Sequence, residues 1–186
     1  MTGKEVHPMK FTKMQGAGND FIVLDNRSGE ICENEYSALA ARLCRRRLSI
    51  GADGLMIVLP AQGIGDYAMR FYNSDGSLGE MCGNGARCIA RYGYDRGLAG
   101  DIQRIETTAG IVVGQRIEED LYCVRLNDPT VLELDHPVEV DGVRYPCSYV
   151  ELGHPGLQLL LGEQDLLYIL MHCHSLSFSL FPVLFS

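Results

Sequence analysis

The sequence lacks an excess of positive charge. Among its 186 residues, 16 are Lys or Arg and 24 are Asp or Glu, which gives a formal net charge of −8. Binding to nucleic acid phosphates requires a basic face, and Arg45-Arg46-Arg47 is the single basic cluster in the sequence. The charge therefore argues against nucleic acid as the main partner, and we expect this cluster to be the solvated end of a helix.

The seven cysteines lack any pair at C-x-x-C spacing; they stand at positions 32, 44, 82, 88, 123, 147 and 173. The first residues also lack the features of a secretory signal. This pattern predicts a protein of the reducing cytoplasm. The closest set of metal-ligating side chains is His172-Cys173-His174, in which adjacent residues cannot easily point at one ion, so we expect no metal site.

Low-complexity tracts are absent as well. Hydrophobic residues make up 46% and charged residues 22% of the sequence, as in soluble globular proteins, so most of the chain should fold. The length suits one ordinary domain and an incomplete remainder. Asn127-Asp128-Pro129 is typical of a linker, and from about Leu157 the composition changes to Leu, Ser, Phe and His. We therefore expect the first domain to end before this linker.

Alternation of apolar and polar residues predicts many short strands. They are expected over Lys10–Met14, Phe21–Leu24, Leu55–Leu59, Tyr67–Tyr72, Ile102–Thr107, Ile111–Ile117, Leu121–Leu126 and Tyr149–Leu152. A hairpin is expected over Val138–Tyr145. Loops rich in Gly, Asn and Asp separate the first of these strands from one another. Strands outnumber helices, so a sheet should dominate the fold.

Two segments have the apolar spacing of helices. The first is Glu33–Arg46, with Asn34 as the expected N-cap and arginines in the last turn, where the helix dipole favours them. The second is Asn84–Tyr94, which lacks proline. Its packing face consists of small or compact residues: Ala86, Ile89, Ala90 and Gly93. Small side chains allow strands to enclose a helix closely.

The loop Cys82-Gly83-Asn84-Gly85 stands where the second helix should begin. A thiol acts as a base only when part of it is ionised near neutral pH, and a helix N-terminus is a usual means of lowering its pKa. The glycines let the backbone turn tightly and leave N–H groups exposed, which can bind a carboxylate. One loop could thus hold a base and an anion site, which removal of the α-proton of an amino acid requires.

The alternative is that Cys82 is a buried small hydrophobe, as most free cysteines are. Cys88 faces about 240° away from it at 100° per residue, so we expect Cys88 to pack in the core. Two other loops, Gly18-Asn19-Asp20 and Asn73-Ser74-Asp75-Gly76, place an amide beside glycine. Those asparagines are either turn residues or ligand-binding amides.

Four motifs follow one another in the first half of the sequence. They are Lys13-Met14-Gln15-Gly16-Ala17-Gly18-Asn19-Asp20-Phe21, Gly51-Ala52-Asp53-Gly54-Leu55, Phe71-Tyr72-Asn73-Ser74-Asp75-Gly76-Ser77 and Met81-Cys82-Gly83-Asn84-Gly85-Ala86-Arg87-Cys88. In this order and spacing they closely resemble the N-terminal half of the diaminopimelate epimerase family. The resemblance runs from about Met9 to Gly153, and it favours a functional role for Cys82 over the core alternative.

The resemblance implies an α/β (α+β) fold in which a curled, barrel-like mixed sheet surrounds a central helix. Family members have two such pseudo-symmetric domains, with the substrate in the cleft, one catalytic cysteine from each domain, and no cofactor or metal. For this sequence it implies an N-terminal lead at 1–8, a complete first domain at 9–126, a fragment of the second domain at 127–156 and a divergent apolar tail at 157–186.

By the same resemblance, the expected activity is the interconversion of LL- and meso-diaminopimelate by two thiols, without PLP, in lysine and cell-wall precursor synthesis. Cys82 is then the proton-donating and proton-accepting thiol of the first domain. Gly83 and Asn84 bind a substrate carboxylate, and Asn19 and Asn73 bind the amino and carboxylate groups. The partner is thus a small molecule, and a homodimer is compatible with this assignment.

The sequence departs from the family pattern at two places. Many members carry Gln at the position of Gly54, where it reaches the substrate. No second cysteine loop follows Leu152, and Cys173 has no neighbouring glycines, so we expect a chain truncated or shifted in frame near Leu157 and impaired in activity. One alternative is a related proline-racemase-like enzyme, which shares the two-cysteine logic but explains the four loops less well. Another is a non-catalytic binding or membrane-associated protein with Leu166–Phe185 as an anchor. That run is long enough to span a bilayer but contains histidines, serines and a proline.

Overall fold

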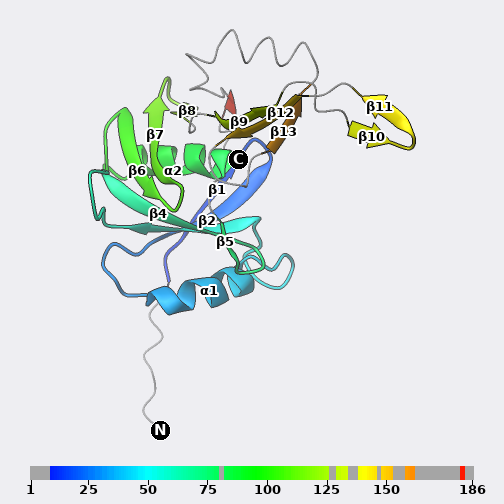
Figure 1. Ribbon diagram of the computed structural model, residues 1–186. Helices are drawn as coiled ribbons and strands as arrows, with labels where there is room; N and C mark the ends of the chain where they lie inside the picture. The colour runs from blue at the N-terminus through cyan, green and yellow to red at the C-terminus, as the bar shows by residue number, and fades with distance from the viewer. Residues whose placement is uncertain are drawn as a thin grey trace.

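The computed structural model describes residues 9–79, 82–125, 129–133, 138–145, 148–152, 158–161 and 181–182. A nine-stranded sheet dominates this part of the chain, with strands in the order β1-β2-β3-β4-β6-β7-β8-β14 and β5 beside β4 (Figure 1). Its strands are β1 (Thr12–Gly16), β2 (Asn19–Asp25), β3 (Gly54–Leu59), β4 (Tyr67–Asn73), β5 (Leu78–Gly79), β6 (Ile102–Thr107), β7 (Gly110–Arg116), β8 (Leu121–Arg125) and β14 (Phe181–Pro182). The sheet is mixed, because β2 and β3 run parallel, as do β4 and β6, while the other neighbours are antiparallel.

Two helices lie on opposite faces of this sheet. The sheet curls around α2 (Gly83–Asp95), which contacts β1, β2, β6, β7 and β8 (Figure 1). The other helix, α1 (Tyr36–Leu43), follows a 3-10 turn at Glu33–Glu35 and packs against β3 and β4. The predicted α/β (α+β) class, with a curled mixed sheet around a central helix, is therefore confirmed.

The strands β2 and β3 are buried on both faces, which explains why their sequences are apolar without interruption. Successive side chains of a strand point to opposite faces. On β2, Phe21 and Val23 belong to the core around α2, whereas Ile22 and Leu24 belong to the core beneath α1. The side chains of β3 divide between the two cores in the same way. Two hydrophobic cores therefore share one pair of central strands.

The packing face of α2 is as small as the sequence predicts. Ile89 and Ala90 are fully buried, and a Cβ added to Gly93 would lie 2.4 Å from Tyr67 Oη and 2.5 Å from Gln103 Oε1. The Tyr67 hydroxyl lies 2.7 Å from Gln103 Oε1 and 3.0 Å from the carbonyl of Ile89, and Gln103 Nε2 donates to the carbonyl of Ala90 at 2.7 Å. These buried polar groups have hydrogen-bond partners and join the helix to β4 and β6.

The predicted strands of the main sheet are confirmed, with small differences at their ends. The first helix differs more. It begins at Tyr36 after the 3-10 turn, and the carboxylate of Glu35 accepts a hydrogen bond from the N–H of Cys32 at 3.1 Å. The expectation that Asn34 is the N-cap is therefore wrong, because the turn already begins after Cys32. The arginine cluster also lies beyond the helix, which ends at Leu43.

Beyond β8 the structure describes a hairpin and a separate three-stranded sheet. The hairpin turns at Asp141-Gly142, where both residues have positive φ, as predicted for this segment. The elements are β10 (Val138–Val140) and β11 (Val143–Tyr145) in the hairpin, and β13 (Gln158–Leu161), β12 (Ser148–Leu152) and β9 (Pro129–Glu133) in the sheet. Pro129, assigned to a linker from the sequence, instead begins an edge strand, where proline is tolerated. Asn127 and Asp128 lie outside the described residues.

Part of the predicted apolar tail is described. The strand β13 pairs antiparallel with β12, and β14 pairs antiparallel with β8. Apart from β14, the expected anchor Leu166–Phe185 lies outside the described residues, as does the lead at 1–8. Among the residues that are described, no helix is long and apolar enough to cross a membrane. The domain boundaries drawn from the sequence stay predictions.

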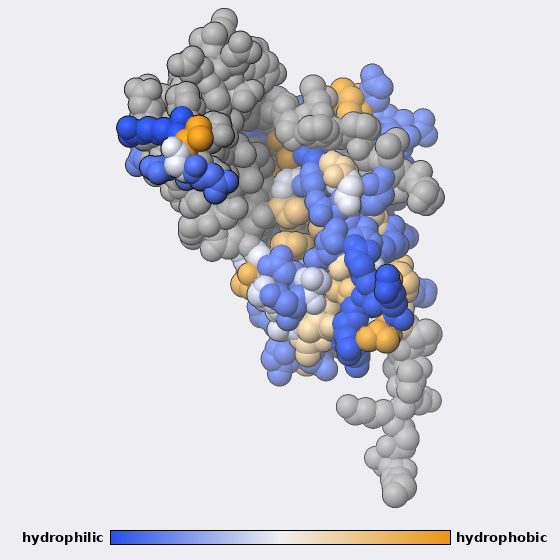
Figure 2. Space-filling view, turned by 90° about the vertical axis from the view of Figure 1, so that its right-hand side faces the viewer, coloured by the Kyte–Doolittle hydropathy of each residue, from blue (hydrophilic) through white to orange (hydrophobic). Residues whose placement is uncertain are grey.

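On the face that Figure 2 shows, the described residues are mainly hydrophilic, and their hydrophobic side chains lie in small groups. Over the described residues, the most exposed large hydrophobic side chains are Ile64 (78%), Leu48 (73%) and Ile102 (65%), which come from separate segments. The apolar residues are thus concentrated in the two cores, which hold the elements that carry the site.

We expect Gly93→Ala to destabilise the chain. In a helix interior Ala is favoured over Gly by about 1 kcal/mol. Here the added methyl overlaps two buried oxygen atoms that hydrogen bonds hold in place, which costs about 2–4 kcal/mol. The free energy of unfolding, measured by urea denaturation, should therefore fall by roughly 2 kcal/mol. Gly100→Ala is the control because its added Cβ would meet nothing within 4 Å, and an equal loss in both variants would contradict close enclosure of α2.

Candidate active site

Cys82 lies at the N-terminus of α2, as the sequence predicts. Its backbone is extended (φ −136°, ψ 110°), and its carbonyl accepts a helical hydrogen bond from Ala86 N–H at 2.7 Å. Its Sγ accepts a hydrogen bond from Gly85 N–H at 3.4 Å. The half-buried thiol thus takes the N-cap position that Ser, Thr, Asp or Asn usually occupies. At least one N–H of the first helical turn therefore points at the sulfur.

The electrostatic surroundings of this thiol differ from the expectation. Burial raises the pKa of Cys82 above its ordinary value, although hydrogen bonds from Gly85 N–H and Asn84 N–H and the charge of Arg87 act to lower it. The expectation of a lowered pKa is therefore wrong, because the enclosed thiolate loses more hydration than the helix N-terminus replaces. The raised pKa favours the protonated thiol over the thiolate in the resting chain.

The other described cysteines occupy different environments. Cys88 is fully buried in the core around α2, as predicted, and burial raises its pKa to about 12. Cys44 and Cys123 are also buried, whereas Cys32 is exposed. Positions 147 and 173 lie outside the described residues. Cys82 thus combines partial exposure with a helix N-terminus.

The predicted asparagines come from strand ends at one edge of the sheet. In the strand register, Phe21 of β2 pairs with Gly54 of β3, and Gly54 pairs with Asn73 of β4. Asn19, at the start of β2, therefore lies at the same edge as Asn73, at the end of β4. Asn84, in the first turn of α2, donates from Nδ2 to Asn19 Oδ1 at 2.7 Å. The structure thus brings Asn19 and Asn84 into direct contact beside the thiol.

Asn73 and Gly83 are placed less directly. The Nδ2 of Asn73 donates to Ser77 Oγ at 2.9 Å within its own turn, and the next residue, Ser74, donates its N–H to the carbonyl of Asp53 at 3.1 Å. Gly83 is the first residue of α2, and a Cβ added there would meet no atom of the described residues within 4 Å. None of these residues therefore fills the space beside Gly83. A contact from Asn73 to a substrate stays a prediction.

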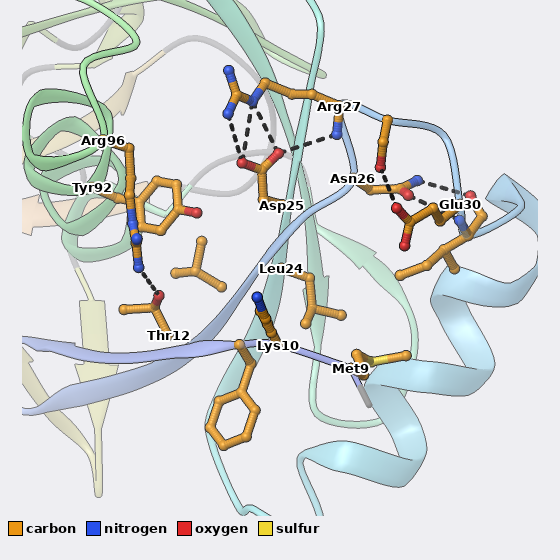
Figure 3. A pocket seen from close by; sticks show the side chains of 14 residues that line it. Met9, Lys10, Thr12, Leu24, Asp25, Asn26, Arg27, Glu30, Tyr92 and Arg96 are labelled. Atoms are coloured by element: carbon orange, nitrogen blue, oxygen red, sulfur yellow. Dashed lines mark hydrogen bonds and ion pairs between the residues drawn. The ribbon is translucent and has the colours of Figure 1, made fainter. Parts of the chain in front are cut away.

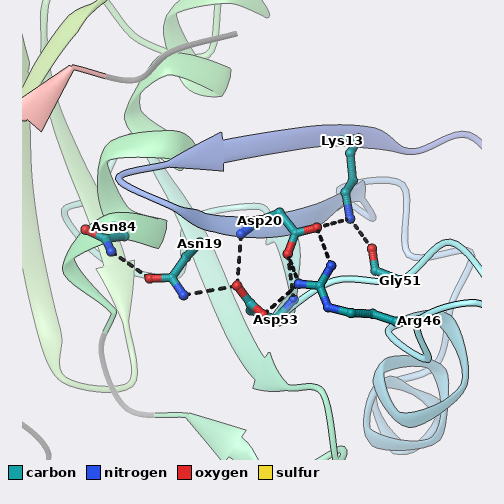
Figure 4. A network of polar contacts seen from close by, with 7 residues as sticks. All are labelled: Lys13, Asn19, Asp20, Arg46, Gly51, Asp53 and Asn84. Carbon is teal, nitrogen blue, oxygen red and sulfur yellow. Dashed lines mark hydrogen bonds and ion pairs between the residues drawn. The ribbon is translucent and has the colours of Figure 1, made fainter. Parts of the chain in front are cut away.

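A network of four charged side chains, which the motifs alone do not reveal, adjoins Asn19 (Figure 4). Asn19 Nδ2 donates to Asp53 Oδ2 at 3.0 Å. Arg46 bridges Asp20 and Asp53, with 2.8 Å between its Nη2 and Asp53 Oδ1, and Lys13 Nζ lies 2.8 Å from Asp20 Oδ2. The N–H groups of the two aspartates donate to each other's carboxylates at 3.1 and 3.2 Å. The network therefore holds the starts of β2 and β3 together.

The cations keep both carboxyl groups ionised. Burial raises the pKa of Asp20, but hydrogen bonds and charges from Lys13 and Arg46 outweigh burial and lower it to about 2. At Asp53, burial likewise raises the pKa, but hydrogen bonds from Asn19, Arg46 and the Asp20 N–H lower it overall. Arg46 is exposed, as expected of a solvated cluster, and it also joins two carboxylates. In the sequence, the signal for this network was the pair of glycine-containing motifs around Asp20 and Asp53. These motifs do not show that two residues 33 positions apart form a hydrogen bond.

Comparison with known proteins supports the resemblance of these motifs. The model of the diaminopimelate epimerase family matches residues 11–129. The chain belongs to the diaminopimelate epimerase family. It is 40% identical over 164 residues to the diaminopimelate epimerase of Caldanaerobacter subterraneus subsp. tengcongensis, and 34% identical over 174 residues to that of Pelotomaculum thermopropionicum. These alignments cover 79% and 84% of this chain but 58% and 62% of the relatives, so the chain spans less than two thirds of their length.

Solved structures share the fold at low sequence identity. A PhzF-family phenazine biosynthesis protein of Bacillus anthracis has a TM-score of 0.59 at 19% identity, covering 81% of this chain and 53% of that structure. A hydroxyproline epimerase from Agrobacterium vitis has a TM-score of 0.56 at 17% identity, covering 86% and 53%. The curled sheet around a helix is therefore a fold that the diaminopimelate epimerase family shares with other proteins.

The structure accounts for Gly54, the position at which the sequence was expected to depart from the family pattern. A Cβ at Gly54 would lie 2.3 Å from Phe71 Cε2 and 2.9 Å from the carbonyl oxygen of Tyr72. The Phe71 ring is buried and packs edge-on against Phe21, with 6.1 Å between ring centroids. The ring therefore occupies the space that a side chain on residue 54 would need, and this position offers no side-chain contact to a substrate.

A groove of about 1120 Å³ lies elsewhere, at the C-terminal end of α2 (Figure 3). It is lined by Tyr92 and Arg96 of α2, by the start of β1 and by residues between 23 and 31. Both arginines that line it already have partners: Arg27 forms a bidentate pair with Asp25 at 2.8 and 2.9 Å, and the Arg96 guanidinium lies 5.4 Å from the centre of the Tyr92 ring. This groove contains none of the predicted site residues. In the described ranges, no group of three His, Cys, Asp or Glu could hold a metal ion.

The charged network should make stability depend on acid pH. The lowered pKa of Asp20 contributes stability that is present above the unfolded pKa of about 4 and is lost as the pH falls through the folded value of about 2. Asp20→Asn should therefore lower the free energy of unfolding at pH 7 by about 1 kcal/mol, since the pairs are partly exposed. Urea denaturation should show this difference shrinking between about pH 4 and pH 2. Asp101→Asn, whose pair with Arg116 spans 3.7 Å, serves as the control; a difference independent of pH would refute the assignment.

The raised pKa of Cys82 should be visible in its reactivity. Only the thiolate reacts with iodoacetamide, so alkylation should be slow at pH 7 and should rise with an inflection above the ordinary thiol value of about 8.5. Trypsin cleaves after Arg87 and so places Cys82 and Cys88 in different peptides. Mass spectrometry of the peptide that ends at Arg87 therefore measures alkylation of Cys82 separately from that of Cys88. Cys82→Ser should remove the signal. An inflection below about pH 8 would mean that the helix N-terminus outweighs burial.

Proposed function

We propose that the chain contributes one of two thiols to the interconversion of LL- and meso-diaminopimelate, by proton transfer at the α-carbon. The observation that carries the proposal is Cys82 capping α2 beside the joined amides of Asn19 and Asn84. Membership of the diaminopimelate epimerase family supports the substrate. We place this activity in the cytoplasm, with a small molecule as the partner of the site.

The chemistry requires a proton acceptor on one face of the α-carbon and stabilisation of the charge that develops. When the C–H bond breaks, its electron pair spreads onto the adjacent carboxylate, which hydrogen-bond donors must stabilise. Gly83 and Asn84, at the positive end of α2, supply such donors in this proposal, and Asn19 and Asn73 bind the amino and carboxylate groups. No described residue fills the space beside Gly83, which supports approach of a ligand.

The protonation state of Cys82 suits a donor in the resting chain. Its raised pKa keeps the S–H bond intact until a carbanion forms on its side of the α-carbon. The carbanion then takes the proton from sulfur, so that a C–H bond forms and the thiolate remains. In the reverse direction the thiolate takes the α-proton back. Hydrogen bonds from Gly85 N–H and Asn84 N–H and the charge of Arg87 favour that thiolate.

One thiol serves one face, so inversion requires a second thiol on the other. The printed sequence contains a single Cys-Gly-x-Gly loop. In this proposal the thiolate form of Cys82, a minor fraction at neutral pH, takes the α-proton at one face, exchanges it with solvent and returns a solvent proton at the same face. Net inversion needs a second thiol in the same cleft. The proposal thus separates two activities, proton exchange and epimerisation, that a complete two-thiol site combines.

The test is solvent deuterium incorporation at the α-carbon. The purified chain is incubated with LL- or meso-diaminopimelate in deuterium oxide, and incorporation is followed by mass spectrometry. Cys82→Ala should lower the rate by at least about 100-fold, because a positioned general acid–base contributes 10²–10⁴-fold. Cys32→Ala, which removes an exposed thiol away from α2, should leave the rate unchanged. Equal rates for wild type and Cys82→Ala would show that Cys82 is not the proton carrier.

A further inference from the structure

We propose that Asp53 and Arg87 are positioning residues that set the orientation of the Asn19 and Asn84 amides beside Cys82. The inference rests on the proposed function and deepens it, because it assigns the residues that orient the substrate. It concerns four side chains joined by hydrogen bonds. Asn19 lies at the start of β2, Asp53 directly precedes β3, and Asn84 and Arg87 lie in the first turns of α2.

The four side chains form a continuous line of hydrogen bonds. Asp53 Oδ2 accepts from Asn19 Nδ2 at 3.0 Å, and Asn19 Oδ1 accepts from Asn84 Nδ2 at 2.7 Å (Figure 4). At the far end Asn84 Oδ1 accepts from the guanidinium of Arg87, whose side chain is buried. The line therefore runs from a carboxylate, through two amides, to a cation.

The charges at the two ends determine which way each amide points. An amide has a donor end and an acceptor end of nearly equal shape, so packing alone does not distinguish its two orientations. If Asn19 turned over, its carbonyl oxygen would face the carboxylate of Asp53. If Asn84 turned over, its NH2 group would face the guanidinium of Arg87. Both reversals place like partial charges together, so the native order is strongly preferred.

The network around Asp53 keeps this end of the line anionic. Arg46 Nη2 lies 2.8 Å from Asp53 Oδ1, and the N–H of Asp20 donates to Asp53 Oδ2 at 3.1 Å. The resulting low pKa of Asp53 means that the carboxylate accepts hydrogen bonds throughout the neutral range. Arg87 stays charged because a guanidinium does not lose its proton at neutral pH. The polarity of the line is thus permanent under the conditions of catalysis.

The fixed amides have a stereochemical consequence. The line uses one N–H and one oxygen lone pair of each amide, which leaves a second N–H and a second lone pair on each for a ligand. An amino-acid substrate carries an ammonium group that needs acceptors and a carboxylate that needs donors. Amides of set orientation therefore bind this pair of groups one way round, and the same face of the α-carbon meets Cys82 each time.

The main test compares Asp53→Asn with wild type in the deuterium exchange of LL- and meso-diaminopimelate. The variant keeps the shape but loses the charge that orients Asn19. The quantity compared is the exchange rate of the faster isomer divided by that of the slower isomer. We expect this ratio to fall about tenfold, towards one, in Asp53→Asn, since a charge-assisted hydrogen bond is worth about 1.5 kcal/mol or more. A role in stability alone would slow both isomers equally. Asp101→Asn, an exposed aspartate far from this line in sequence, is the matched control and should keep the wild-type ratio.

A second measurement uses NMR of the side-chain amides in the 15N-labelled full chain, so it does not depend on catalysis. In wild type, the Asn19 and Asn84 NH2 groups should exchange slowly with solvent, and both should shift as Asp53 is protonated in acid. An unchanged exchange ratio in folded Asp53→Asn, or rapidly exchanging wild-type amides, would overturn the proposal. Absence of any exchange of diaminopimelate by wild type would instead refute the proposed function, and the amide signals would still decide the role of Asp53.

Discussion

The close enclosure of α2 by the curled sheet is the constraint on which the rest of the site depends. A Cβ on Gly114 would lie 2.8 Å from Ala90 Cβ, and one on Gly16 would lie 3.2 Å from the carbonyl oxygen of Asn84. At these contacts glycine permits an approach that a side chain would prevent. The N-terminus of α2 is thereby held beside the turn between β1 and β2, and this contact brings Cys82 to the sheet edge where the asparagines lie.

Apolar packing positions the helix, whereas charge positions the strand ends around it. Two aspartates at the starts of parallel strands repel one another unless cations lie between them, and Lys13 and Arg46 provide this compensation for Asp20 and Asp53. Hydrogen bonds to charged groups are strong and directional. They position the strand ends, which lie beyond the hydrophobic core. Asn19 lies where the network meets α2, so the two kinds of interaction converge on the amide pair.

Features governed by neighbouring residues were predictable from the sequence. Alternating polarity located the strands of the main sheet, and the glycines around Cys82 located the start of α2. The misassigned N-cap at Asn34 shows the limit of local signals, because the contact of Glu35 with Cys32 begins the turn earlier. Pro129 was likewise taken for a linker residue, although the edge of a small sheet accommodates it.

By itself the sequence determined the strands, the central helix and the loop that carries the thiol, because periodicity and glycine act over a few residues. Only the tertiary structure decided that Asn84 meets Asn19, 65 positions away, and that Arg46 joins two aspartates. It also decided that burial outweighs the helix N-terminus at Cys82. The physical reason is that desolvation and charge pairing depend on atoms contributed by distant segments, which meet only when the sheet closes around α2.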